Sequence, residues 1–171
     1  ASMGIVSFFK EAGEKLFGHK DAEAAAQQAQ AAPDNAALQA AAAAANQKAA
    51  SAIESYIATQ SLGADGLQVT FDGATSTATV AGTAADQATK EKILLCCGNV
   101  TGVAQVNDLM TVAEPADESK YHTVARGDTL SAIAKTYYGN AGAYMKIFEA
   151  NRPMLGHPDK IYPGQLLRIP A

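Results

Sequence analysis

The sequence predicts an α+β protein made of two small domains and an N-terminal helical segment. Short stretches of alternating apolar and polar residues, such as 67–71 and 77–81, are typical of strands, and the stretches between them have the spacing of helices. An acidic, proline-containing segment without large apolar side chains, 114–120, separates two such units. A length of 171 residues suits one or two small domains. We therefore divide the chain into an N-terminal segment (1–46), a first domain (47–113), a linker (114–120) and a second domain (121–171).

Residues 5–17 predict an amphipathic helix. Apolar side chains at helical spacing would share one of its faces: Ile5, Phe8, Phe9, Ala12, Leu16 and Phe17. The alanine-rich stretch 22–50 also favours helix, because alanine has the highest helix propensity. Pro33 is expected to interrupt it, and Asp34 to cap the second piece. This stretch has few large apolar residues to bury, so we expect a spacer without chemistry of its own.

The first domain is expected to follow the order α-β-β-α-β. A helix that Gly63 can end precedes a hairpin of the two strands named above. Thr83 can cap a second helix over residues 84–97. A third strand is expected over residues 103–112.

The connection between this second helix and the third strand, residues 98–103, is a candidate cation site. Gly98 is placed where a helix commonly takes a left-handed residue, and Gly102 permits a second unusual backbone angle. The end of a helix leaves carbonyl oxygens without partners and carries partial negative charge. Several carbonyls facing one point would suit a weakly hydrated cation. The same residues also fit an ordinary helix-to-strand connection, and the residues alone leave both readings open.

The second domain is expected to follow the order β-α-α-β. A short strand over 121–125 leads into a turn, after which Asp128 or Thr129 can cap a helix. A second helix around Tyr144 to Asn151 is stopped by Pro153, and the last strand spans 166–169.

Composition excludes several classes of function. A net charge of −4 and a pI of about 5.3 argue against nucleic-acid and anionic-membrane partners. Adjacent Cys96 and Cys97 are placed as small core residues, and the three histidines lie far apart, so no transition-metal spacing exists. We find neither a nucleophile–base set nor a nucleotide-binding motif, which argues against an enzyme. No membrane span and no clear signal peptide is present, so we expect a cytoplasmic monomer.

The second domain resembles the LysM family. The segments YHTVARGDTLSAIAKTYYGN, IFEANRP and IYPGQLLRIP follow one another at the expected spacing over residues 121–170. The resemblance implies a shallow groove for glycans that contain N-acetylglucosamine. By position its residues are Gly127, Asp128, Thr129, Leu130, Asn151, Ile161 and Pro163. An alternative reading is a turn and cap at Gly127 and Asp128, with Leu130 and Ile161 in the core.

The first domain resembles the BON family, through TVAGTA, the helix after it and GNVTGVAQVND. Together with FFKEAGEKLF at residues 8–17, the whole chain resembles a family of cytoplasmic potassium-binding BON–LysM proteins. That resemblance implies that K⁺ is held by backbone carbonyl oxygens and makes the protein more compact. The matching positions are Phe9, Lys10, Ala12, Gly98, Val100 and Val103. The competing functions are a glycan-binding module of the cell envelope and a general interaction scaffold.

Overall fold

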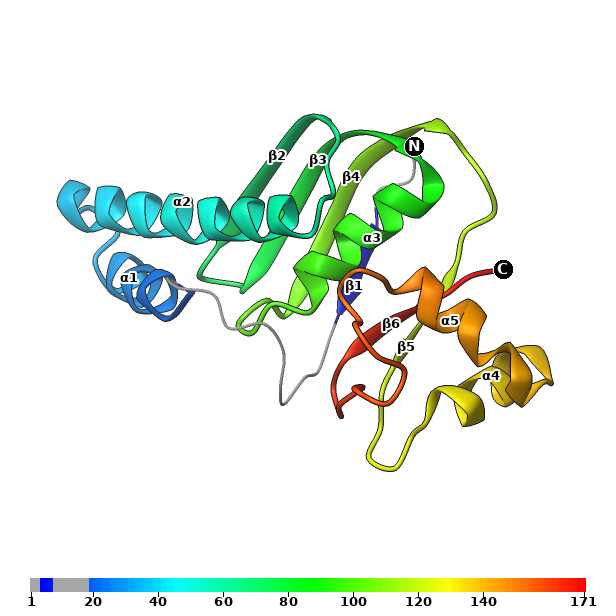
Figure 1. Ribbon diagram of the computed structural model, residues 1–171. Helices are drawn as coiled ribbons and strands as arrows, with labels where there is room; N and C mark the ends of the chain where they lie inside the picture. The colour runs from blue at the N-terminus through cyan, green and yellow to red at the C-terminus, as the bar shows by residue number, and fades with distance from the viewer. Residues whose placement is uncertain (1–3, 8–18) are drawn as a thin grey trace.

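The computed structural model describes residues 4–7 and 19–171. Figure 1 shows an α+β arrangement in which a sheet with helices on it is joined to a smaller domain. The elements in chain order are β1 (Gly4–Ser7), α1 (His19–Ala31), α2 (Ala36–Thr59), β2 (Asp65–Asp72), β3 (Thr77–Asp86), α3 (Gln87–Gly98), β4 (Gln105–Glu114), β5 (Lys120–Thr123), α4 (Leu130–Tyr138), η1 (Ala141–Ala143), α5 (Tyr144–Ala150) and β6 (Leu166–Ile169).

The larger domain is built on a four-stranded sheet in the order β1-β4-β3-β2. Strands β2 and β3 form the expected antiparallel hairpin, and β3 and β4 are parallel strands joined through α3. Helices α2 and α3 cover one face of the sheet (Figure 1). Alternate side chains of the strands meet these helices in one core, which includes Ile57, Val80, Ile93 and Met110. The order α-β-β-α-β predicted for this domain is confirmed.

Strand β1 corrects the prediction of a helix that starts at Ile5. Residues Gly4–Ser7 pair antiparallel with β4, with Gly4 opposite Asp108 and Ser7 opposite Gln105. The β-branched pair Ile5-Val6 suits a strand, and the open edge of β4 supplies backbone partners that a local sequence pattern cannot reveal. The rest of the predicted helix, residues 8–17, lies outside the described residues.

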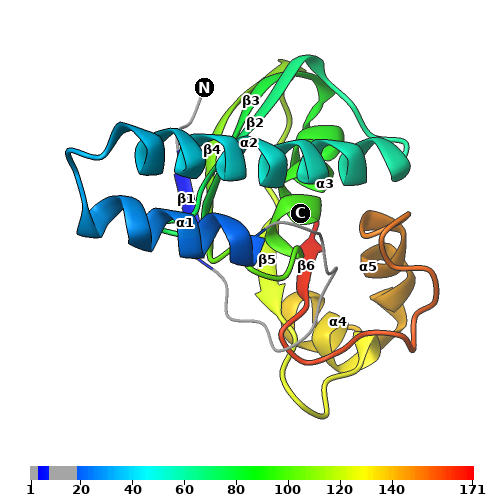
Figure 2. The ribbon, with the colours of Figure 1, turned by 90° about the vertical axis from the view of Figure 1, so that its left-hand side faces the viewer.

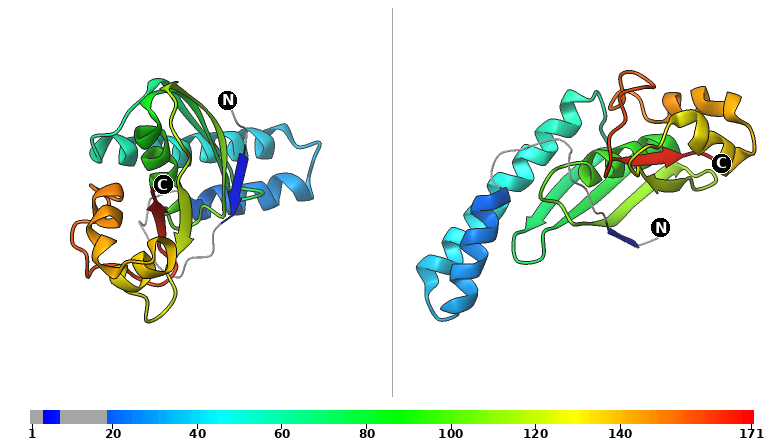
Figure 3. Two further views of the ribbon diagram at one scale, coloured as in Figure 1. Left: turned by 90° about the vertical axis from the view of Figure 1, so that its right-hand side faces the viewer. Right: turned by 90° about the horizontal axis from the view of Figure 1, so that it is seen from below.

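The alanine-rich stretch forms a helical hairpin that projects beyond the sheet, with α1 and α2 side by side (Figures 2 and 3). Alanines at helical spacing on α1, including Ala22 and Ala26, are buried, so the two helices approach closely. The break at Pro33 is confirmed, because α1 ends at Ala31 and α2 begins at Ala36. The cap is Asn35, whose side chain accepts from the Leu38 N–H, and not Asp34 as predicted. Asn35 stands directly before the first helical residue, as an N-cap must.

Two helix ends of the larger domain also differ from the predictions. Helix α3 is capped by Asp86, whose side chain accepts from the Thr89 N–H at 2.8 Å, because β3 continues through Thr83 to Asp86. Helix α2 ends at Thr59 and not at Gly63, and Ser61 takes the left-handed angle, with φ 57°. Helix α3 therefore begins three residues later than predicted, and helix α2 ends before the predicted glycine, with Gln60 as its C-cap.

The smaller domain has the predicted β-α-α-β order, with β5 and β6 antiparallel. Of the two candidate caps for α4, Thr129 is the one used, since its hydroxyl accepts from the Ala132 N–H at 3.1 Å. A separate core that includes Leu130, Ile133 and Ile147 holds α4 and α5 on the two strands. Among the described residues, no helix is both long enough and apolar enough to cross a membrane.

Candidate functional site

The turn between α3 and β4 lies where the first domain, the N-terminal strand and the second domain meet. The first domain positions it through α3, whose apolar residues before the turn, Ile93 to Cys97, are all buried. At the helix end, the Asn99 N–H donates to the Leu95 carbonyl at 3.1 Å, and the Val100 N–H to the Cys97 carbonyl at 3.2 Å. These two hydrogen bonds fix the backbone where the chain leaves the helix.

The backbone angles of this turn differ from the prediction at Gly98. Gly98 is the last residue of α3, and the helix is capped by Asn99 with φ −92° and ψ 2°. The positive angle belongs to Gly102, with φ 98°. A tight turn between Val100 and Val103, closed by a hydrogen bond of 3.2 Å, demands a glycine there, whereas the helix simply runs on through Gly98.

The turn presents oxygen acceptors and no charged side chain. The side chains of Val100 and Val103 are buried in the core, so these residues anchor the turn and offer only their backbone to an ion. The Val100 carbonyl accepts one hydrogen bond from Val103, and a carbonyl oxygen has a second lone pair. The negative end of the α3 dipole adds to the attraction for a cation.

Three of the six predicted ligands, Gly98, Val100 and Val103, are thus brought together on one turn. The other three, Phe9, Lys10 and Ala12, lie outside the described residues. The described residues on the N-terminal side of them reach the strand that follows this turn. Ser7 at the end of β1 pairs with Gln105, and β1 runs antiparallel to β4, so it points toward Val103.

The other end of that segment is fixed nearby. The Ser76 hydroxyl lies 3.3 Å from a carboxylate oxygen of Glu23 on α1, and the Ser76 carbonyl accepts from the Ala104 N–H at 2.8 Å. Gly73 packs so closely on α1 that a Cβ there would overlap the Ala22 carbonyl. Ser7 and Glu23, one on each side of the residues that are not described, are therefore both linked to the residues that follow Val103, Ser7 directly and Glu23 through Ser76.

Two residues of the turn that the sequence reasoning missed have special surroundings. The Asn99 side chain is buried and makes two hydrogen bonds with the backbone of Leu166 in β6, at 2.8 and 3.1 Å. The Thr101 hydroxyl is buried and has no hydrogen-bond partner among the described residues. One feature of the sequence could have drawn attention to them: within residues 98–103, Asn99 and Thr101 are the residues with polar side chains.

A buried ion pair continues the contact between the two domains along α3. The Arg168 guanidinium on β6 lies 2.8 Å from the Glu91 carboxylate, which also accepts from the Ser119 N–H at 2.8 Å and its hydroxyl at 2.7 Å. Burial by itself raises the pKa of Glu91, but the bonds from Ser119 and Arg168 outweigh it and leave this pKa below its ordinary value. Glu91 thus joins α3, the linker and β6.

The residues predicted for a glycan groove have mixed surroundings. Leu130 is buried and Ile161 packs on the core of the smaller domain, whereas Gly127, Thr129 and Pro163 are exposed. Gly127 adopts φ 86°. The Ala125 N–H and His122 bind the Asp128 carboxylate and hold its pKa below the ordinary value.

Asn151, the remaining predicted groove residue, is 1% exposed. Its amide exchanges two hydrogen bonds with the backbone of Arg168 and donates a third to the Ile147 carbonyl. This residue holds α5 on β6, and a sugar could reach its amide only by breaking those bonds.

The cysteines and the metal-binding side-chain types offer less support for a functional site than the turn does. Cys96 and Cys97 form no disulfide and are buried, as predicted for core residues, and burial raises the pKa of the Cys96 thiol to about 12. In the described part of the chain, no three His, Cys, Asp or Glu residues form a metal-binding group.

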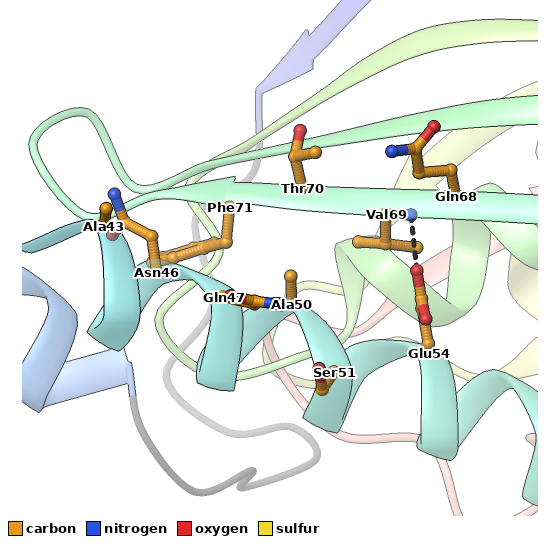
Figure 4. A pocket seen from close by; sticks show the side chains of 10 residues that line it. All are labelled: Ala43, Asn46, Gln47, Ala50, Ser51, Glu54, Gln68, Val69, Thr70 and Phe71. Atoms are coloured by element: carbon orange, nitrogen blue, oxygen red, sulfur yellow. Dashed lines mark hydrogen bonds between the residues drawn. The ribbon is translucent and has the colours of Figure 1, made fainter.

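Figure 4 shows a cavity of about 520 Å³ between α2 and the edge strand β2. Glu54 accepts from the Val69 N–H at 2.8 Å, and Asn46 from the Gly73 N–H at 3.0 Å. These side chains cover the open edge of the sheet, which protects it from pairing with another chain.

Fold and sequence together define a protein with a BON domain joined to a LysM domain. Residues 45–114 match the BON domain family, and residues 122–170 match the LysM domain family. The chain is 44% identical over 172 residues to the "Potassium binding protein Kbp" of Escherichia coli O6:H1 (strain CFT073), which covers 98% of this chain and 99% of that protein. The chain therefore belongs to the Kbp family. It is also 39% identical over 76 residues to an uncharacterized protein of Deinococcus radiodurans, which covers 43% of this chain and 29% of that protein.

Proposed function

We propose that this protein binds K⁺ reversibly in the cytoplasm, acting as a sensor or buffer of the ion. The ion is held by the backbone carbonyls of Gly98, Val100 and Val103 on one side and by those of Phe9, Lys10 and Ala12 on the other. The similarity to a potassium-binding protein over nearly the full length supports the choice of ion. BON and LysM are families of binding domains, so we propose binding and not catalysis.

The observation that carries the proposal is the anchoring of both ends of the segment after Ser7. Ser7 is paired with Gln105, and Glu23 at the other end lies beside Ser76, which bonds to Ala104. Phe9 follows Ser7 by two residues, and a fully extended chain spans at most about 3.6 Å per residue. The two residues that separate Phe9 from Ser7 are therefore a short enough connection for the proposal to assign the Phe9 carbonyl to an ion at the end of β4 that adjoins Val103.

The chemistry of the turn fits K⁺ better than a divalent cation. Calcium and magnesium sites usually recruit carboxylates, whereas neutral carbonyl dipoles can replace the hydration shell of K⁺. Residues 98–103 contain no carboxylate. An ion shared by the two carbonyl sets would tie the N-terminal segment to the first domain, and we propose that this makes the protein more compact and more stable.

Thermal unfolding in potassium chloride and sodium chloride of equal ionic strength tests the proposal, with choline chloride as the ion-free reference. A ligand that binds only the folded state adds about 2.7 kcal/mol at one hundred times its Kd. We expect a higher melting temperature in potassium chloride. Lys10→Ala keeps its backbone carbonyl and serves as the control variant, which should respond within a few-fold of the parent. Equal melting temperatures in all three salts would rule the proposed function out.

A second candidate function is binding of N-acetylglucosamine-containing glycans by the LysM domain. The match to this family over 122–170 and the exposed turn at Gly127 favour it. Retention on insoluble peptidoglycan, with a glycan-binding LysM protein as positive control, tests it. Retention that chitin oligomers abolish would establish this function. If the protein is not retained, glycan binding is ruled out and the LysM domain serves to pack against the rest of the protein.

A further inference from the structure

The hydroxyl of Thr101 is a buried polar group without a hydrogen-bond partner among the described residues. Leaving such a group unsatisfied costs about 1–3 kcal/mol, so native structures rarely retain one without a reason. Threonine is not needed here for the backbone path, because the special angle of the turn belongs to Gly102. The hydroxyl therefore calls for a partner that the described part of the chain does not supply.

The covalent position of Thr101 puts its hydroxyl beside a proposed ligand. The carbonyl of Val100 belongs to the peptide bond that begins Thr101, so only a few bonds separate the two oxygens. The hydrogen bond from Val103 to Val100 closes the turn around Thr101, and the buried side chains of both valines hold it in place. The residue that carries this buried oxygen is therefore the next one in the chain after the Val100 carbonyl, inside the turn that this carbonyl closes.

We propose that Thr101 Oγ1 is a further ligand of the bound K⁺, in addition to the backbone carbonyls. This inference rests on the proposed function. A hydroxyl oxygen carries two acceptor lone pairs, and a cation satisfies one of them. An added oxygen raises the number of ligands, which is one of the factors that favour K⁺ over Na⁺. Thr101 then serves both affinity and selectivity, and a buried hydroxyl without a partner among the described residues is the cost of that role.

The assignment predicts opposite effects of one substitution on two measurements. Thr101→Val keeps the shape of the side chain and removes the unpartnered oxygen. In choline chloride without K⁺, the melting temperature of Thr101→Val should equal or exceed that of the parent, because a buried unsatisfied group has been removed. In calorimetric titration, its affinity for K⁺ should fall roughly tenfold, which corresponds to about 1.4 kcal/mol, and the ratio of K⁺ to Na⁺ affinity should fall as well.

Two further variants make the comparison decisive. Thr101→Ser keeps the hydroxyl and should retain K⁺ affinity within a few-fold. Thr70→Val changes an exposed threonine on β2, two strands away from β4, and should alter neither measurement.

Each outcome separates the assignment from the proposed function. A parent protein that shows no K⁺ binding overturns both. A parent that binds K⁺, with Thr101→Val binding equally well and with the same selectivity, overturns the Thr101 assignment alone. A Thr101→Val protein that melts at a clearly lower temperature without K⁺ also overturns it, because the hydroxyl would then have a partner in the ion-free fold.

Discussion

Single side chains decide how the turn after α3 is held. Asn99 lies between two proposed ligand residues, Gly98 and Val100, and its amide completes the backbone hydrogen bonding of Leu166. Backbone groups buried without a partner are costly, so this one side chain fixes both the turn and the last strand.

We expect Asn99→Ala to lower the free energy of unfolding by about 2–4 kcal/mol, because it leaves the N–H and C=O of Leu166 without partners. Urea unfolding measures the change. Asn107→Ala, on the partly exposed face of β4, is the matched control and should cost less than about 1 kcal/mol. An equal decrease of the free energy of unfolding in the two variants would show that the hydrogen bonds to Leu166 do not contribute to stability beyond an ordinary surface contact.

Gly102 is the residue whose backbone angle the turn requires. With φ at 98°, a β-branched side chain there is strained, whereas Gly98 has helical angles that other residues adopt. We therefore expect Gly102→Val to reduce K⁺ affinity at least as much as Gly98→Val in calorimetric titration. Normal affinity in Gly102→Val would mean that the turn is not part of the ion site.

At the level of elements, β6 is attached to α3 at two points. Arg168 pairs with Glu91, and Leu166 bonds with Asn99. The Glu91–Arg168 pair is nearly inaccessible to solvent, with 3% and 10% of the two side chains exposed. Loss of one partner of such a pair leaves an uncompensated buried charge.

This pair makes the docking of the LysM domain sensitive to acid. The pKa of Glu91 is lowered by folding, so its stabilising effect is present above the ordinary value of 4.5 and is lost as the pH falls below it. Glu91→Gln should destabilise the protein by about 3–5 kcal/mol at neutral pH, and the difference from the parent should shrink below pH 4.5.

Chemical unfolding at a series of pH values follows this difference. Glu149→Gln removes an exposed partner of Arg152 and is the control, expected to cost less than about 1 kcal/mol at any pH. A pH-independent difference between Glu91→Gln and the parent would contradict the role of the charge.

Local patterns were sufficient to predict most elements of both domains, because their helices and strands are consistent with periodicity and turn residues. Strand β1 was missed because its partner, β4, lies about a hundred residues further along the chain. Asn99 was missed for the same reason, since its partner Leu166 is 67 residues away. The capping residues of α2 and α3 were misassigned because each helix is preceded by two polar residues that could cap it, Asp34 and Asn35 for α2 and Thr83 and Asp86 for α3. Only the residue at which the helix actually begins decides between them. The ligand set came from resemblance, and the Thr101 hydroxyl required knowledge of burial.

At the scale of the whole molecule, the N-terminal segment is attached to the larger domain through the pairing of β1 with β4, whereas the LysM domain has a core of its own. We expect deletion of residues 3–17 to leave the LysM domain folded and to abolish stabilisation by K⁺, as measured by thermal unfolding in the two chloride salts.

A second variant separates the ligands from β1. Replacing residues 8–18 by a Gly-Ser segment of equal length keeps β1 and its pairing. It should weaken K⁺ binding without abolishing it, since the carbonyls remain but a more flexible chain loses more entropy when it is ordered. Undiminished K⁺ affinity in the deletion variant would remove the N-terminal segment from the ion site.

The position of β6 has a consequence for the protein as it is being made. Leu166 and Arg168, which bind α3 from the side of the LysM domain, follow their partners Asn99 and Glu91 by 67 and 77 residues in the chain. Because synthesis runs from the N-terminus, every proposed ion ligand leaves the ribosome before the strand that fixes Asn99. The ion site is therefore made early, and the strand β6 that holds its turn is added only after most of the LysM domain has been synthesised.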